Sequence, residues 1–282
     1  THACGDFVLK EYGRRLAKLT VNGEYFAARY GGDEFLLVYK CGHIEKNGRE
    51  IELLRQLLNE PMYFNGTKLS ITVTLGFADS SIDVSYDELL TNADIAMYEA
   101  KKIGFGTCLG FMPEMKESVL RRNSIIDILK DECEHGGFEI RYQPEISTKT
   151  GDVCAFEALV RLKDYSVGPD VFIPVAESSG FIARIGRIVT EKVLRQMDIW
   201  RSEGMKLRKV AINYSNGQLV DDGYVLHLKN MMEKYRIPSD LIEIEITESL
   251  FMGKKGRVTQ LFDELAKIGV TLALDDFGTG YS

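Results

Sequence analysis

The sequence predicts an α/β fold in two parts, a smaller mixed region followed by a mostly parallel, barrel-like region. From about residue 138 onward, short apolar runs alternate with stretches of helical spacing, a pattern typical of parallel α/β architecture. Before about residue 111, a glycine pair and short apolar runs are typical of a hairpin and separate helices. We therefore expect one domain over residues 1–111 and a second over residues 112–282.

The first region is expected to combine helices with a hairpin. Gly31 and Gly32 separate two apolar runs, which is a tight-turn signal between strands. Ser85 and Glu88 form a capping-box pattern that opens a helix reaching about Lys102. The remaining elements are helices at 7–19 and 51–58, and strands at 25–30, 35–39 and 70–77.

The second region is expected to alternate strands with helices. Apolar runs of strand length occur at 138–143, 153–160, 209–213, 241–247 and 270–275, and helical spacing occurs at 115–133, 188–200, 224–235 and 257–268. Within the strand at 241–247, isoleucines alternate with polar residues, so Ile244 lies on one face and Glu245 on the other. An apolar face under helices and a polar inner face suit a strand of a (β/α)8 barrel.

Composition narrows the class of protein. The net charge of -7 argues against a protein that grips a nucleic-acid polymer over a broad surface. The 5 cysteines are scattered, which disfavours disulfides and zinc and favours a reducing cytoplasm. No apolar run in this span approaches the roughly 20 residues of a membrane helix. Because the chain begins at Thr1, we expect it to belong to a longer protein, in which a membrane or sensor segment could lie outside this span.

Acidic or amide residues lie at the ends of separate apolar runs, namely Glu157, Asn213, Glu245, Asp275 and Asp276. In a parallel barrel, the carboxyl ends of the strands converge on one rim, where the chemistry takes place. Carboxylates brought this close repel one another unless a cation neutralises them, and oxygen ligands suit Mg²⁺ or Mn²⁺. A metal pair at this rim suits hydrolysis of a phosphate ester. Each residue alone is also compatible with a helix cap or a solvated loop, and enolisation or aldol chemistry on a barrel would present a similar pattern.

The second region also resembles a known family, the EAL domain, which is the cyclic-di-GMP phosphodiesterase fold. The resemblance covers nearly all of residues 141–282 in the family's order. It is carried by the segments Tyr142-Gln143-Pro144, Phe156–Arg161, Phe172–Glu177, Asn213-Tyr214-Ser215, Glu245–Ser249 and Asp275–Ser282. This combination is highly specific, whereas Glu-Ala-Leu alone would carry no information. The resemblance implies a TIM-type (β/α)8 barrel that hydrolyses cyclic-di-GMP to the linear dinucleotide pGpG.

The resemblance further implies a role for individual residues. A first Mg²⁺ or Mn²⁺ ion would be bound by Glu157, Asn213, Glu245 and Asp275, and a second by Asp275 and Asp276. Of these ligands, Glu157, Asp275 and Asp276 would also carry the catalysis. Gln143 and Arg161 would hold the substrate, with Arg161 near phosphate, where a guanidinium fork fits well. Glu248 would act in catalysis by anchoring the loop that places Asp276. On the residues alone, a surface ion pair for Arg161 and a helix cap for Glu248 stay open.

The first region resembles the GGDEF domain, the diguanylate cyclase fold with a nucleotide-cyclase palm-like α+β architecture. Its signature hairpin matches Arg29–Phe35, its late helix matches Asn92–Lys101, and the end of its guanine-contacting motif matches His2 and Asp6. The resemblance implies that Asp33 binds a metal ion with Glu34 assisting, that Asp6 reads guanine, and that Lys101 contacts phosphate. On the residues alone, Asp33 and Glu34 are equally compatible with polar positions of a hairpin.

The chain also departs from both families. The GGDEF resemblance begins inside a motif, and Phe105 stands where that family usually has an arginine. The barrel part is shorter than the about 250 residues of a complete (β/α)8 barrel. We therefore expect incomplete domains at both ends, a degenerate and regulatory GGDEF domain, and hydrolysis by the longer protein with weak activity in this span. A receptor that binds cyclic-di-GMP or GTP without turnover, a diguanylate cyclase, and a homodimer stay open.

Overall fold

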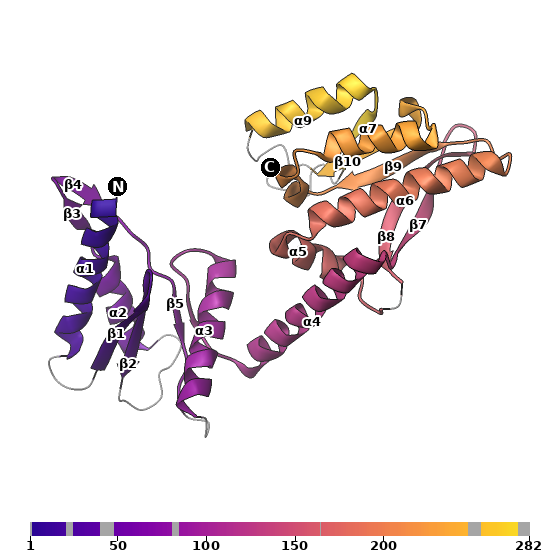
Figure 1. The fold of residues 1–282 in the computed structure, drawn as a ribbon. Coiled ribbons are helices and arrows are strands. Elements are labelled where there is room, and N and C mark those ends of the chain that lie inside the picture. Colours follow the sequence, from indigo (N-terminus) through magenta and orange to yellow (C-terminus); the bar gives the residue numbers. More distant parts are fainter. Residues whose placement is uncertain are drawn as a thin grey trace. The chain divides into compact units, whose positions relative to one another are not determined.

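The structure is a computed structural model that describes residues 2–20, 25–39, 48–80, 85–163, 165–247 and 255–275. The chain divides into two compact units, Thr1–Leu120 and Arg121–Ser282, which are described separately below (Figure 1). Helix α4 (Pro113–His135) contains the division between the units. The expected domain boundary at residue 111 stays a prediction.

The first unit combines two helices beside a hairpin with a third helix on a short parallel strand pair. Its elements are α1 (His2–Leu19), β1 (Tyr25–Gly31), β2 (Glu34–Tyr39), α2 (Arg49–Asn59), β3 (Met62–Phe64), β4 (Thr67–Leu69), β5 (Leu75–Phe77), α3 (Tyr86–Ile103) and β6 (Cys108–Gly110). The predicted glycine hairpin is confirmed, because β1 and β2 pair antiparallel. Of the strand predicted over 70–77, only β5 (Leu75–Phe77) forms, and residues 70–74 are irregular.

Two close contacts hold the first unit together. Gly76 in β5 lies so near α3 that a Cβ there would approach the backbone nitrogen of Met97 to 2.1 Å. Arg15 in α1 is buried, and its guanidinium donates to the carbonyl of Leu58 in the last turn of α2 at 3.2 Å and to that of Glu60, the residue after α2, at 2.7 Å. These bonds satisfy carbonyl groups that a helix end leaves without intrahelical partners.

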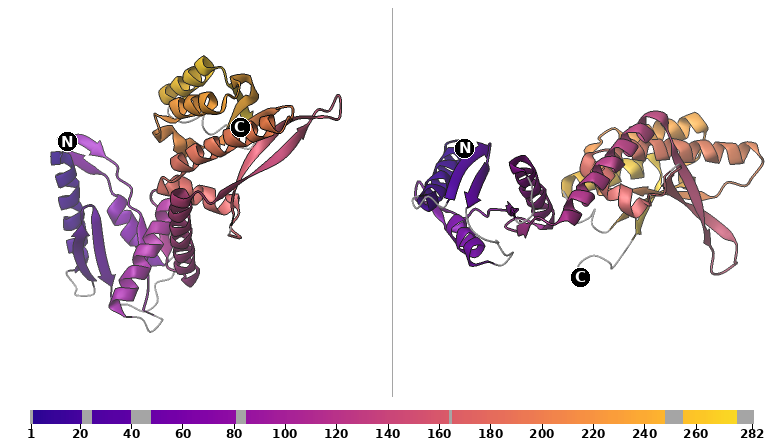
Figure 2. Two further views of the ribbon diagram at one scale, coloured as in Figure 1. Left: turned by 45° about the vertical axis from the view of Figure 1, so that its right-hand side comes forward. Right: turned by 90° about the horizontal axis from the view of Figure 1, so that it is seen from below.

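The second unit is built on one five-stranded sheet in the order β11-β10-β9-β8-β7. Its strands are β7 (Phe138–Ile146), β8 (Val153–Leu162), β9 (Lys209–Tyr214), β10 (Ile242–Thr247) and β11 (Thr271–Asp275). Four neighbouring strands run parallel, as predicted, whereas β7 pairs antiparallel with β8. The connection between β7 and β8 is a short turn, so no crossover helix is needed. Figure 2 shows this long hairpin projecting past the helices.

Helices cover one face of this sheet. They are α4, α5 (Pro169–Ser179), α6 (Ile182–Ser202), α7 (Tyr224–Tyr235) and α9 (Lys255–Ile268), with short 3₁₀ turns η2 (Asn216–Val220) and η3 (Ser239–Leu241) (Figure 1). Every second residue of β10, including Ile242 and Ile244, is fully buried in the core against them. Residues between them, such as Glu245, lie on the other face, which we call the open face. Among the described residues, no helix is both long and apolar enough to span a membrane.

Candidate metal centre on the open face

Strand pairing brings the predicted first-metal residues onto neighbouring strands of the open face. Glu245 lies directly beside Asn213, because β9 and β10 pair in that register. Asp275 lies beside Thr247, two residues beyond Glu245 on β10. Glu157 lies beside Ala211, two residues before Asn213. Since residues two apart on a strand share a face, the four predicted ligands occupy one face of β8, β9, β10 and β11.

Asn213 and Glu157 are already in contact. The Asn213 amide nitrogen Nδ2 donates to Glu157 Oε1 at 2.7 Å. The Asn213 side chain is exposed and that of Glu157 is half-buried, so the pair faces the space over the sheet. A half-turn of the amide would present its oxygen Oδ1 in place of the nitrogen, so the same side chain can accept a cation as well as donate to a carboxylate.

Glu245 has the most perturbed environment of the four. Burial, together with the negative charges of Glu157 and Asp275, raises the pKa of Glu245 from 4.5 to about 7. Its atom Oε2 is buried and has no hydrogen-bond partner among the described residues. A buried carboxylate oxygen without a donor is costly, and either a proton or a cation relieves that cost.

These residues fit a divalent cation in chemistry. Three carboxylates and one amide supply hard oxygen donors, which are the ligands preferred by Mg²⁺ and Mn²⁺. A cation would also satisfy the buried Glu245 Oε2, which no described residue contacts by a hydrogen bond. Within the ranges that the structure describes, no three His, Cys, Asp or Glu side chains are gathered closely enough to hold an ion. Asp276 and Glu248 lie outside the described residues.

The predicted substrate residues lie on β8, the strand that carries Glu157, and on its neighbour β7. Gln143 is the strand partner of Glu157, and it is exposed on β7. Arg161 lies further along β8, opposite Glu139, and its Nη1 donates to the carbonyl of Val160 at 2.8 Å. Both side chains alternate with residues that pack on the core, so both belong to the open face.

The contacts that fix the turn after Asn213 were not predicted from the sequence. The Ser215 hydroxyl donates to Glu177 of α5 and accepts from the backbone nitrogen of Gly217. Gln218 Oε1 in turn accepts from the backbone nitrogen of Ser215 at 3.0 Å, which completes a capping box at η2. The Ser-x-x-Gln pattern at 215–218 was a readable signal for this cap, but nothing in the sequence predicted that Glu177 would join it.

A charged pair that was not predicted from the sequence also lies on the open face, two residues before Glu245 on β10. Lys209 Nζ contacts Glu243 Oε2 at 3.0 Å and Thr271 Oγ1 at 3.2 Å. Lys209 is thus a partner of Glu243 and not of Glu245, whose Oε2 has no hydrogen-bond partner among the described residues.

In the first unit, the structure brings two of the four predicted nucleotide residues together. Lys101 Nζ lies 3.9 Å from Glu34 Oε1, which joins the hairpin to α3. Both of these side chains are about half exposed, so the charge pair contributes little to stability. Asp6 and Asp33 are exposed.

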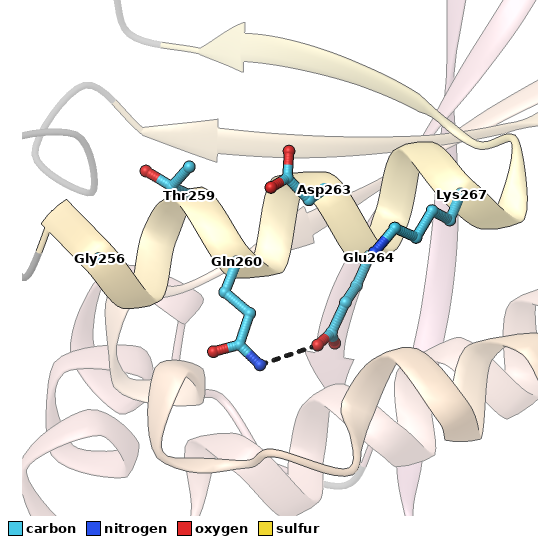
Figure 3. Close-up of a pocket in the computed structure, with 6 residues that line it drawn as sticks. All are labelled: Gly256, Thr259, Gln260, Asp263, Glu264 and Lys267. Carbon is cyan, nitrogen blue, oxygen red and sulfur yellow. Dashed lines mark hydrogen bonds between the residues drawn. The ribbon is translucent and has the colours of Figure 1, made fainter.

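A hollow along α9 is separate from the carboxylates Glu157, Glu245 and Asp275. It is lined by Gly256, Thr259, Gln260, Asp263, Glu264 and Lys267 (Figure 3). Gln260 Nε2 donates to Glu264 Oε1 at 2.9 Å along the helix. Because the opposite side of α9 packs on the core through Val258, Leu261 and Leu265, this hollow lies on the far side of the helical layer from the open face.

Comparison with known proteins agrees with this architecture. The family model described as the EAL domain matches residues 126–282, and the model described as the diguanylate cyclase GGDEF domain matches residues 2–107. The solved structure of the PaMucR phosphodiesterase in a c-di-GMP complex has a TM-score of 0.52 at 30% identity, over 56% of this chain and 66% of that chain. The EAL domain of Xanthomonas citri FimX shares the fold, with a TM-score of 0.52 at 18% identity over 58% of this chain and 65% of that chain.

Several curated relatives match along the whole chain, among them MucR and PdeR. The bifunctional diguanylate cyclase/cyclic di-GMP phosphodiesterase MucR of Pseudomonas aeruginosa is 31% identical over 100% of this chain and 42% of its own length. The cyclic di-GMP phosphodiesterase PdeR of Escherichia coli is 32% identical over 100% of this chain and 43% of its own length. The chain therefore spans less than half the length of these relatives. It belongs to the EAL domain family, with a region that matches the GGDEF family in front of the EAL domain.

Proposed function

We propose that the EAL domain hydrolyses cyclic-di-GMP to linear pGpG with two divalent ions. The observation that carries the proposal is the set of oxygen donors on the open face, among which Glu245 has a buried oxygen without a partner in the described part of the chain. The names of MucR and PdeR, which share about a third of this sequence, support the same substrate.

The proposed mechanism assigns separate work to separate side chains. Glu157, Asn213, Glu245 and Asp275 would bind the first cation, and Asp275 and Asp276 the second. When bound, the ions would polarise the phosphoryl oxygen and lower the pKa of the attacking water. Glu245 would release its proton on binding, because a pKa of about 7 leaves it partly protonated near neutral pH.

The substrate would be oriented by residues beside this cluster. Arg161 would hold a phosphate oxygen pair through its guanidinium fork. Gln143 would donate from its amide to the dinucleotide over β7, since it lies level with Glu157. Glu248 would anchor the loop that carries Asp276.

A regulatory role is proposed for the GGDEF region. The aromatic side chain of Phe105, which replaces the family's usual arginine, is 91% exposed and supplies no phosphate contact. We therefore expect GTP binding at most, and no cyclic-di-GMP formation from GTP.

The test uses the full-length natural protein with Mg²⁺ or Mn²⁺ and chromatography of the linear product. Glu157→Gln is expected to lower turnover about 100-fold or more, because the loss of one ligand to a catalytic cation removes several kcal/mol of transition-state stabilisation. Glu203→Gln, an exposed site at the end of α6, is the matched control and should retain turnover. Equal turnover by wild type and Glu157→Gln would discard the assignment. Binding of cyclic-di-GMP without turnover by the wild type would instead identify a receptor.

A further inference from the structure

Two opposite charges on the open face of β7 have no role in the mechanism above. Ile140 and Tyr142 pack on the core, so Glu139 and Arg141, which alternate with them, lie on the open face. Neither charge was among the residues predicted from the sequence to bind substrate or metal.

Their position in the sheet places them beside the proposed substrate residues. Arg141 pairs with Leu159, between the pair that contains Gln143 and the pair that contains Arg161. Residues two apart on a strand are separated by about 7 Å, which is within the length of an arginine side chain. A ligand that touches both Gln143 and Arg161 therefore passes over Arg141.

Both charges are available to a ligand. The side chain of Arg141 is 66% exposed and that of Glu139 is 46% exposed. Arg141 Nε lies 3.6 Å from Glu139 Oε1, which is longer than a hydrogen bond. Exposed ion pairs contribute little, so a ligand can separate this pair at small cost.

The combination of charges selects the chemistry of the ligand. A guanidinium donates in a bidentate manner to the acceptors O6 and N7 of guanine. A carboxylate accepts, and guanine offers the donors N1–H and N2–H₂ on the adjoining edge. A phosphate would be attracted by Arg141 but repelled by Glu139, and adenine presents an amino donor where guanine has O6.

We propose that Glu139 and Arg141 together recognise one guanine base of the cyclic dinucleotide. This inference rests on the proposed function, because it takes cyclic-di-GMP as the ligand of the open face. It assigns base selectivity to the edge strand β7, apart from the carboxylates that would bind the cations.

The experiment measures dissociation constants for cyclic-di-GMP and cyclic-di-AMP by calorimetry, using the full-length natural protein in EDTA so that no turnover occurs. Arg141→Met is expected to weaken cyclic-di-GMP about 10- to 100-fold, the range for one bidentate arginine–guanine contact. Binding of cyclic-di-AMP should change less than about threefold, since adenine lacks O6. Glu139→Gln should weaken cyclic-di-GMP by a smaller factor, because its amide oxygen still accepts one bond.

Arg195→Met, an exposed arginine on α6, is the matched control and should change neither constant. Equal weakening of both ligands in Arg141→Met would identify a phosphate contact and overturn guanine recognition. Unchanged constants would overturn it as well, since the pair would then be only a solvated ion pair. If the wild type binds neither dinucleotide, the proposed function itself fails and this inference falls with it.

Discussion

Replacement of Glu245 by glutamine tests the electrostatics of the open face directly. Glu245 is held beside Glu157 and Asp275 in a partly buried position, and its pKa rises from 4.5 to about 7. A glutamine of nearly the same shape carries no charge at any pH. In the absence of divalent ions, Glu245→Gln should therefore stabilise the second unit at high pH while it prevents the site from binding cations.

The sign and size of the effect follow from proton linkage. An acid with a raised pKa in the folded state contributes stability that is full below pH 4.5 and is lost as the pH rises to about 7. The interval between these two pKa values corresponds to at most about 3 kcal/mol. Solvent screening of a partly buried group reduces this to about 1–2 kcal/mol. We expect Glu245→Gln to gain that amount relative to wild type between about pH 4.5 and pH 8.

Urea unfolding in EDTA provides the measurement. Trp200, the single tryptophan of the chain, packs against Tyr142 with ring centroids 4.8 Å apart, so its fluorescence reports on the second unit. Glu203→Gln at an exposed site is the control for removal of a charge alone. A pH dependence no larger than that of the control would refute the reasoning. So would a loss of stability at high pH, which would mean that the carboxylate is favourable even without a cation.

Two further predictions concern the first unit. Arg15→Met should destabilise it by about 3 kcal/mol, because the buried guanidinium donates to carbonyls at the end of α2 that would lose their partner, and circular dichroism during urea unfolding measures this loss. Gly76→Ala should cost about 3 kcal/mol in the same assay, since the new Cβ would meet the α3 backbone. The control Gly5→Ala on α1, where no atom of the described residues lies within 4 Å of the new Cβ, should leave stability equal or raise it by about 1 kcal/mol. A loss in Gly5→Ala equal to that in Gly76→Ala would contradict the close-approach argument.

Periodicity was sufficient to predict most of the sheet and its helices. The alternation of isoleucine and glutamate in β10 gave its two faces, and the structure places Ile244 in the core and Glu245 on the open face. Helix α7 was predicted with the observed bounds. The three-residue strands β3, β4 and β6 were missed, because so short a run carries no period. Helix α5 was missed as well, since Pro174 inside it is a strong helix-breaking signal.

The antiparallel pairing of β7 has a different origin. A strand's direction depends on the length of its connection, and the turn after β7 closes on itself when Ser147 donates its backbone N–H to the Asp152 carbonyl at 2.9 Å. The Thr-Gly-Asp sequence of that turn was visible in the chain. The turn alone does not tell which residues of β7 and β8 lie opposite each other. The placement of Gln143 opposite Glu157 follows from the register of the β7–β8 pair, which the structure provides.

The candidate site was predictable as a set of residues but not as a set of environments. Sequence motifs identified Glu157, Asn213 and Glu245 as a group, yet they treat the three side chains alike. Depth separates them, since the side chain of Asn213 is exposed while Glu245 has a buried oxygen. Depth also depends on neighbours far along the chain, which no local pattern encodes.

The amide at position 213 has a physical reason within this set. A fourth carboxylate beside Glu245 would add another negative charge in a half-buried place, and the repulsion would favour the protonated forms that compete with a cation. An amide supplies an oxygen without a charge, and its nitrogen donates to Glu157 in the structure. Glu157 gains a partner through this bond, whereas the buried oxygen of Glu245 has none among the residues that the structure describes. The free-energy cost of gathering these carboxylates therefore falls mainly on Glu245, whose pKa is raised to about 7. Glu245 is also the residue whose ionisation a bound cation would favour most.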